Sequence, residues 1–215
     1  MLTLLNKLNA YKHIIWDWNG TLIDDAFHTM TVVNELLTEQ GFAPLTLEQY
    51  RDKFCHPVID FYTDIGLNED VIPFDQLCLR FNEIYSDLRK DITLHQEAQE
   101  VVRQIAQGSW TQSILSAAPE NLLKQGVEEH GLTCCFNHIY GLDNMRAASK
   151  IARGQELIRN SGIAPAETIL IGDTDHDFEV AEELGINLVL IAQGHQSFER
   201  LLALHPDTLP QLRAA

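Results

Sequence analysis

The sequence predicts an α/β protein with a parallel β-sheet covered on both faces and an all-helical insert after the first strand. Two observations predict this fold class. From residue 96 onward, short apolar runs alternate with helical stretches, and these runs lack the polar alternation of half-exposed strands. A first apolar run at residues 13–18 is followed instead by a block, residues 25–91, that shows helical patterns and no strand pattern.

The helices of the insert are predicted from apolar spacing and from boundary residues. Residues 25–40 place apolar side chains every three or four positions, and Gly41 follows where a helix C-terminus is expected. Thr46 is a suitable N-cap for a second helix, and Pro57 fits the first turn of a third. The helices expected in the insert span residues 25–40, 46–54, 57–65 and 74–90.

The rest of the chain alternates between strands and helices. Gly131, Gly162 and Gly185 each follow a helical stretch and are expected to end it. The expected strands span residues 13–18, 111–115, 138–140, 168–171 and 187–191. The expected helices of this part span residues 96–107, 119–130, 150–160 and 177–184.

The composition limits the classes of function. The 215 residues suffice for one ordinary core and a modest appendage, and 45% hydrophobic with 21% charged residues is typical of a globular protein. The formal net charge of −16 disfavours nucleic acid and membrane surfaces as partners, and the oligomeric state is left open. Neither a signal peptide nor a membrane span is recognisable, and the four cysteines form no disulfide framework or zinc motif. We therefore expect a cytoplasmic protein.

Chemistry is expected where polar residues directly follow the apolar runs. Asp17 and Asn19 follow the first run, Ser116 follows the second, and Asp173 and Asp177 follow the run at 168–171. The carboxyl ends of parallel strands meet at one edge of the sheet, where ligands bind. Each residue alone would serve equally well as a helix cap, so the joint order carries the prediction. Clustered carboxylates repel one another unless a cation is present, and their hard oxygen atoms favour Mg²⁺.

The acidic run also imitates the start of an EF-hand loop. Asp173, Asp175 and Asp177 have the spacing of the first three ligands. Phe178 stands where that loop needs glycine, and Leu184 stands where it needs glutamate. Calcium binding by this route is therefore excluded.

Four motifs in this order resemble the haloacid dehalogenase superfamily, whose members are mostly phosphatases. Asp17-Trp18-Asn19-Gly20-Thr21-Leu22 is similar to the first motif and Ile114-Leu115-Ser116 to the second. Lys150 suits the third motif, and the stretch from Gly172 to Asp177 suits the fourth. The insert lies where that family carries a helical cap, and Gly194-His195-Gln196-Ser197 is similar to phosphoglycolate-phosphatase-like members.

The resemblance implies a Rossmann-like core of residues 1–22 and 92–215 with a helical cap of residues 23–91. It also implies a Mg²⁺-dependent phosphatase that acts on a small phosphorylated metabolite. Asp17 would attack phosphorus and form an aspartyl-phosphate. Asp17, the carbonyl of Asn19, Asp173 and Asp177 would hold Mg²⁺. Ser116, Lys150 and the backbone amides of Thr21 and Ala117 would bind the phosphoryl oxygens, with Gly20 allowing the tight turn.

One residue departs from the family pattern, which has a second Asp at position 19. That Asp protonates the leaving oxygen and later deprotonates the attacking water. The amide of Asn19 cannot exchange a proton at neutral pH. General acid–base catalysis contributes about 10²–10⁴-fold to a rate, so the departure bears directly on activity.

Three interpretations of Asn19 stay open. The first is a phosphatase that is slow, that acts on esters whose leaving group needs little protonation, or that recruits another acid such as His56. The second is an introduced substitution that traps substrate in a chain that natively carries Asp. The third is a binding or regulatory protein that keeps the metal and phosphate site without useful turnover.

Selectivity is expected to come from the cap. His56 interrupts the insert, and a loop between cap helices forms a suitable roof for the site, so His56 is a candidate substrate-binding residue. A merely exposed or helix-capping histidine is the alternative. Phosphonate cleavage, which needs a Schiff-base lysine such as Lys53, and 2-haloacid dehalogenation, which needs no metal, rank below the phosphatase interpretation.

Overall fold

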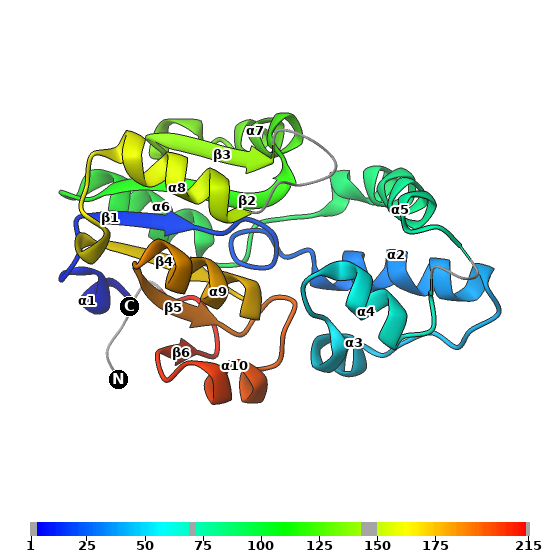
Figure 1. Ribbon diagram of the computed structural model, residues 1–215. Helices are drawn as coiled ribbons and strands as arrows, with labels where there is room; N and C mark the ends of the chain where they lie inside the picture. Colours follow the sequence, from blue (N-terminus) through cyan, green and yellow to red (C-terminus); the bar gives the residue numbers. More distant parts are fainter. Residues whose placement is uncertain (1–3, 69–71, 143–149, 214–215) are drawn as a thin grey trace.

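The sheet sets the layout of the molecule in the computed structural model, which describes residues 4–68, 72–142 and 150–213. Its six strands are all parallel and lie in the order β3-β2-β1-β4-β5-β6. Their bounds are β1 His13–Trp16, β2 Thr111–Pro119, β3 His138–Leu142, β4 Thr168–Gly172, β5 Asn187–Ile191 and β6 Thr208–Leu209. The carboxyl ends of the central strands point toward a separate group of helices (Figure 1).

Helices cover both faces of the sheet because alternate strand residues face opposite sides. Ile14 and Trp16 of β1 pack toward one face, with α1, α6 and α7, whereas Ile15 packs toward the other, with α8, α9 and α10. The bounds are α1 Leu4–Leu8, α6 Ala98–Gln107, α7 Glu120–Glu129, α8 Lys150–Ser161, α9 Asp175–Leu184 and α10 Phe198–Leu204. Three short 3-10 turns are η1 Arg89–Asp91, η2 Thr133–Cys135 and η3 Pro165–Glu167.

The segment after β1 forms a helical lobe with its own core. Its helices are α2 Ala26–Glu39, α3 Leu47–Lys53, α4 Val58–Asp64 and α5 Phe74–Leu88. Leu36, Tyr50 and Phe61 are fully buried in a cluster drawn only from this lobe. Among the described residues of 25–91, every regular element is a helix. Figure 1 shows this lobe beyond the carboxyl edge of the sheet.

The structure confirms the predicted fold class, with a parallel sheet and a helical insertion after β1. The expectation missed α1, α10 and β6, of which α1 and β6 are too brief for periodicity to reveal. The helix expected from residue 177 begins at Asp175, because Thr174 and Asp177 form a capping box at its start. In the described part of the chain, no helix is long and apolar enough to cross a membrane.

One arginine joins the helical lobe to the core. Arg200 of α10 donates to the carbonyls of Arg51, Asp52 and Phe54 at the end of α3, at 3.2, 2.9 and 2.8 Å. A cation is favourable there because a helix C-terminus carries unpaired carbonyls and partial negative charge. In the opposite direction, Arg51 of the lobe donates to the carbonyl of Gly194 in the core at 2.8 Å. The lobe is therefore held to the loop after β5 by charged donors on carbonyl groups.

Replacing Arg200 by alanine is expected to lower the free energy of unfolding by about 1–3 kcal/mol, because three carbonyls lose a charged donor. Urea denaturation of both proteins measures the difference. Arg159→Ala changes an exposed arginine of α8 and serves as the control, with an expected effect within about 0.5 kcal/mol. Equal effects of the two substitutions would contradict this account of Arg200.

Candidate active site

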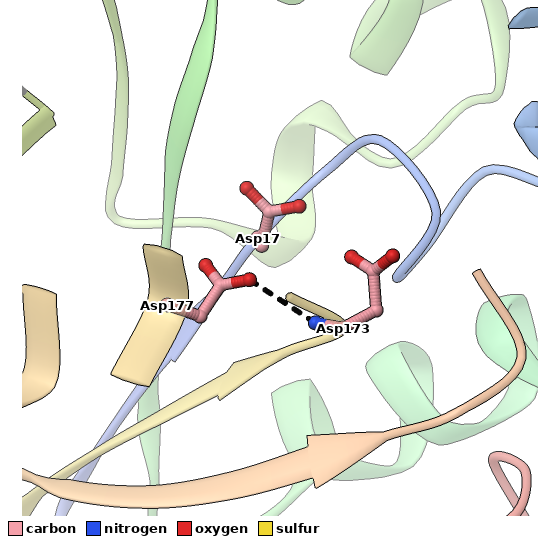
Figure 2. Close-up of side chains that lie close together, drawn as sticks. All are labelled: Asp17, Asp173 and Asp177. Carbon is pink, nitrogen blue, oxygen red and sulfur yellow. Dashed lines mark hydrogen bonds between the residues drawn. The ribbon is translucent and has the colours of Figure 1, made fainter. Parts of the chain in front are cut away.

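Three buried carboxylates meet at the carboxyl edge of the sheet (Figure 2). Asp17 follows β1, Asp173 follows β4, and Asp177 lies in the first turn of α9. One oxygen atom from each lies within 4.8 Å of the others. The parallel pairing of β1 with β4 brings Asp17 and Asp173 together across 156 positions of sequence, as the strand-end argument predicts.

Two glycines let the backbone approach these carboxylates closely. Gly20 has φ of 74°, and a Cβ atom there would lie 2.3 Å from Oδ2 of Asp173. A Cβ atom at Gly172 would lie 2.1 Å from Cγ of Asp177. Glycine is required at both positions because any side chain would displace a carboxylate.

Hydrogen bonds from the surrounding chain hold two of the carboxylates in place. Thr21 Oγ1 donates to Asp173 Oδ1 at 2.9 Å, and the backbone amide of His195 donates to Asp173 Oδ2 at 2.7 Å. Asp177 Oδ2 accepts from the backbone amides of Asp173 and Thr174, both at 3.1 Å (Figure 2). The carboxylates are therefore oriented before any ligand binds.

Lys150 is the cation in contact with the cluster. Its Nζ lies 2.6 Å from Oδ1 of Asp17 and 2.6 Å from Oδ1 of Asp177. Burial alone would lower the pKa of Lys150, but these two carboxylates raise it above its usual value. With all four groups ionised, the cluster has a net charge of −2, which one divalent cation balances.

Burial and mutual repulsion alter the titration of the carboxylates. Burial raises the pKa of Asp17 to about 8, with Lys150 opposing the shift and the neighbouring Asp177 and Asp173 adding to it. Burial also raises the pKa of Asp173 to about 6. Hard oxygen ligands whose charges repel one another fit a metal ion of the Mg²⁺ type. Asp17, Asp173 and Asp177 are the side chains that could hold it.

The second strand runs to Pro119, so Ser116, expected directly after the strand, lies within β2 near the same edge. Trp16 of β1 pairs with Ile114 of β2, so Ser116 comes two positions further along the neighbouring strand. Ser116 is buried, and its Oγ accepts from the backbone amide of Ala118 at 3.1 Å. Ala117 is exposed. No hydrogen bond joins Ser116 to the carboxylates in the described part of the structure.

His56 and Asp175 lie beside the acidic cluster rather than in it. The His56 ring stacks on His176 with centroids 4.9 Å apart, and its Nδ1 is buried without a hydrogen-bond partner among the described residues. Burial lowers the pKa of His56 to about 3, so its ring is neutral at physiological pH. Asp175 instead pairs with Arg200 at 3.2 Å.

A fourth buried carboxylate, which belongs to none of the sequence motifs, lies next to Asn19. Asp25 Oδ2 accepts from Asn19 Nδ2 at 2.7 Å and from the Tyr85 hydroxyl at 2.8 Å. Its Oδ1 accepts from the backbone amide of Gly20 at 2.7 Å. The sequence places Asp25 at a helix start, and it is the N-cap residue of α2, but its side chain turns back to the loop instead of capping that helix. The only sequence signal was its place eight residues after Asp17.

His195 forms an ion pair with Asp25. Its Nε2 lies 3.3 Å from Asp25 Oδ1, and its Nδ1 donates to the Tyr50 hydroxyl at 2.9 Å. Burial by itself would lower the pKa of His195, but Asp25 and the more distant Asp173 raise it to about 9. Burial would raise the pKa of Asp25, and His195 with the other hydrogen-bond donors lowers it overall. Both groups are therefore charged at neutral pH.

Comparison with known proteins agrees with this fold. Residues 14–191 match the haloacid dehalogenase-like hydrolase family. The chain belongs to this family.

Similar proteins cover nearly the same length. Phosphoglycolate phosphatase from Aliivibrio fischeri is 21% identical over 92% of this chain and 91% of its own. The enzyme of that name from Synechococcus elongatus is 24% identical over 91% of each chain. A haloacid dehalogenase-like hydrolase from Streptococcus pneumoniae has a TM-score of 0.80 at 20% identity, covering 93% of each chain. At such low identity the structural similarity establishes the fold alone.

The ion pair of His195 with Asp25 is expected to make stability depend on pH. Because the pKa of His195 is raised from 6.5 to about 9, its contribution is fully present below about pH 6.5 and is lost as pH rises through about 9. In EDTA, His195→Gln should lower the free energy of unfolding by about 3 kcal/mol near pH 6.5 and by less above pH 9. Urea titrations across pH measure this. His28→Gln on α2 is the control, and the same pH profile in both variants would contradict the assignment.

Mg²⁺ affinity is expected to rise with pH. Metal ligands must be deprotonated, and the raised pKa values of Asp17, about 8, and Asp173, about 6, leave protons on them in mildly acidic solution. Isothermal titration calorimetry at several pH values between about 5.5 and 8.5 should show tighter binding and less proton release as pH increases. An affinity independent of pH would contradict the proposed ligands.

Proposed function

We propose that the protein is a Mg²⁺-dependent phosphatase that hydrolyses a small phosphorylated compound through an aspartyl-phosphate on Asp17. The observation that carries the proposal is the buried set of Asp17, Asp173 and Asp177 with Lys150 at the carboxyl edge of the sheet. Similarity to phosphoglycolate phosphatases over most of the chain supports the phosphatase class.

Each residue of the site has a distinct role in this proposal. Asp17, the backbone carbonyl of Asn19, Asp173 and Asp177 would hold Mg²⁺, which would screen the repulsion between the attacking carboxylate and the phosphoryl group. Lys150 is already within 2.6 Å of Asp17, so its remaining N–H can bind a phosphoryl oxygen held against that carboxylate. Ser116 and the backbone amides of Thr21 and Ala117 complete the phosphoryl site in the proposal, and Gly20 allows the turn.

The reaction is a two-step transfer. A carboxylate oxygen of Asp17 attacks phosphorus, the bond from phosphorus to the leaving oxygen breaks, and the phosphoryl group remains on Asp17. Water then attacks the same phosphorus and releases inorganic phosphate, which restores the carboxylate. His56 lies between α3 and α4 of the helical lobe with its ring stacked on His176, and in the proposal it contacts the part of the substrate remote from phosphorus.

A screen of small phosphorylated metabolites for phosphate release, with Mg²⁺ and with EDTA, tests the proposal. Asp17→Asn is expected to lower the Mg²⁺-dependent rate by more than about 10³-fold, because it removes the nucleophile. Mass spectrometry after an acid quench should find the phosphoryl group on the peptide that contains Asp17. Asp91→Asn alters an exposed carboxylate outside the site and is the matched control.

Two results would argue against this function. Binding of Mg²⁺ and inorganic phosphate without turnover of any compound would favour a regulatory phosphate-binding protein. Equal activity in Asp17→Asn and Asp91→Asn would show that Asp17 is not the nucleophile.

A further inference from the structure

The orientation of the Asn19 side chain is fixed by its neighbours. Its Nδ2 lies 2.7 Å from Asp25 Oδ2 and 3.2 Å from the Tyr85 hydroxyl. A carboxylate only accepts hydrogen bonds, so the amide nitrogen, and not the amide oxygen, must face Asp25. The Tyr85 hydroxyl donates its own hydrogen to Asp25, at 2.8 Å, and can therefore accept the second amide hydrogen.

Both hydrogens of the Asn19 amide are thus committed to Asp25 and Tyr85. Its Oδ1 has no hydrogen-bond partner among the described residues. Asn19 therefore offers an acceptor and no donor to a ligand. It can orient a water molecule, but it cannot donate a proton or a hydrogen bond to a leaving oxygen.

The nearby donor side chains already have partners, apart from the third N–H of Lys150, which the proposed function assigns to a phosphoryl oxygen. Lys150 contacts Asp17 and Asp177, both at 2.6 Å, on the nucleophile side of the site. Both ring nitrogens of His195 are occupied, one by Asp25 and the other by Tyr50. His95 Nε2 donates to the carbonyl of Gly20 at 2.9 Å. The carboxylate next to the Asn19 amide is that of Asp25, which is itself paired with His195.

We infer that this site acts on phosphorylated compounds whose leaving group departs as a weakly basic anion, the carboxylate of an acyl phosphate or the phenolate of an aryl phosphate. The inference rests on the proposed function and narrows its substrate class. Alkyl phosphates such as phosphoglycolate release a strongly basic alkoxide, which needs the proton that Asn19 cannot supply.

The two steps balance without a general acid. Asp17 attacks the phosphate dianion, the bond from phosphorus to the leaving oxygen breaks, and the leaving group departs with that electron pair as an anion. Water then attacks the aspartyl-phosphate while one of its hydrogens bonds to Asn19 Oδ1. Both water hydrogens end on the product, dihydrogen phosphate, and the electron pair of the broken bond restores the carboxylate of Asp17.

The test compares leaving groups at fixed pH and saturating Mg²⁺. Acetyl phosphate, p-nitrophenyl phosphate, phenyl phosphate and phosphoglycolate form a series of increasing leaving-group basicity. For the wild type, kcat/KM should fall steeply along the series, with phosphoglycolate at least about 10²-fold below p-nitrophenyl phosphate. Turnover confined to acetyl phosphate, or to the aryl esters, supports the inference and identifies which anion is the natural leaving group.

The most direct test exchanges the side chains at positions 19 and 25. The double variant Asn19→Asp with Asp25→Asn exchanges the two side chains and keeps the net charge. It should raise kcat/KM for phosphoglycolate by about 10²–10⁴-fold and change the p-nitrophenyl phosphate rate by less than about tenfold. The single variant Asn19→Asp, expected to act in the same direction, covers the case in which the double variant fails to fold. Asn82→Asp makes the same chemical change at an exposed position of α5 and should leave the series unaltered.

NMR can test the hydrogen bonds of the Asn19 amide without any measurement of turnover. In the metal-free protein, both side-chain amide protons of Asn19 should exchange slowly with solvent by NMR, their signal being assigned by its loss in Asn19→Asp. Tyr85→Phe should speed the exchange of one of them. Fast exchange of both protons in the wild type would overturn the inference.

Other outcomes separate this inference from the proposed function. Equal rates for phosphoglycolate and p-nitrophenyl phosphate in the wild type would overturn the inference and leave the phosphatase function standing. If kcat/KM fell more steeply with leaving-group basicity in His56→Ala than in the wild type, His56 would be identified as a proton donor. That result would also overturn the inference. Absence of Mg²⁺-dependent hydrolysis with all four compounds, together with no phosphorylated Asp17, would overturn both.

Discussion

The burial of three carboxylates at one edge of the sheet is the constraint on which the rest of the site depends. Charges taken out of water must be paired or hydrogen-bonded, or their burial is strongly unfavourable. Backbone amides and Thr21 satisfy Asp173 and Asp177, and Lys150 neutralises one charge where Asp17 and Asp177 meet. Gly20 and Gly172 are required because the carboxylates occupy the space that a side chain at either position would need. The net charge of −2 that remains is what a divalent cation would balance.

A second charged pair links the helical lobe to this edge. Asp25 and His195 are both buried, and each binds a tyrosine hydroxyl from the lobe, Tyr85 of α5 and Tyr50 of α3. The amide of Asn19 donates to Asp25 and to Tyr85 of α5, and Tyr85 in turn donates to Asp25. The position of α5 therefore affects which hydrogen-bonding groups of Asn19 are free to contact a ligand. A movement of α5 away from the core would release an amide hydrogen of Asn19.

Sequence patterns predicted those site residues that directly follow a strand. Asp17 and Asp173 each follow an apolar strand, so parallel pairing alone predicts that they meet. The motif order also pointed to Lys150, which contacts two of the three carboxylates. Asp25 was not singled out because a helix-start aspartate usually caps its own helix, and nothing local shows that its side chain turns back. Its partner His195 lies 170 positions away, beyond the reach of any local pattern.

The sequence by itself determined the parallel sheet, the helical insertion after β1 and the strand ends that carry the acidic residues. These features follow from spacing, because periods of two and of three to four residues decide which face of an element is apolar. It also showed that an amide stands at position 19, but not what that amide would do. Only the tertiary structure decided this, since Asp25 and Tyr85 converge on the nitrogen of Asn19 from separate elements. A hydrogen bond needs partners at the right distance and angle, and folding alone brings such partners together.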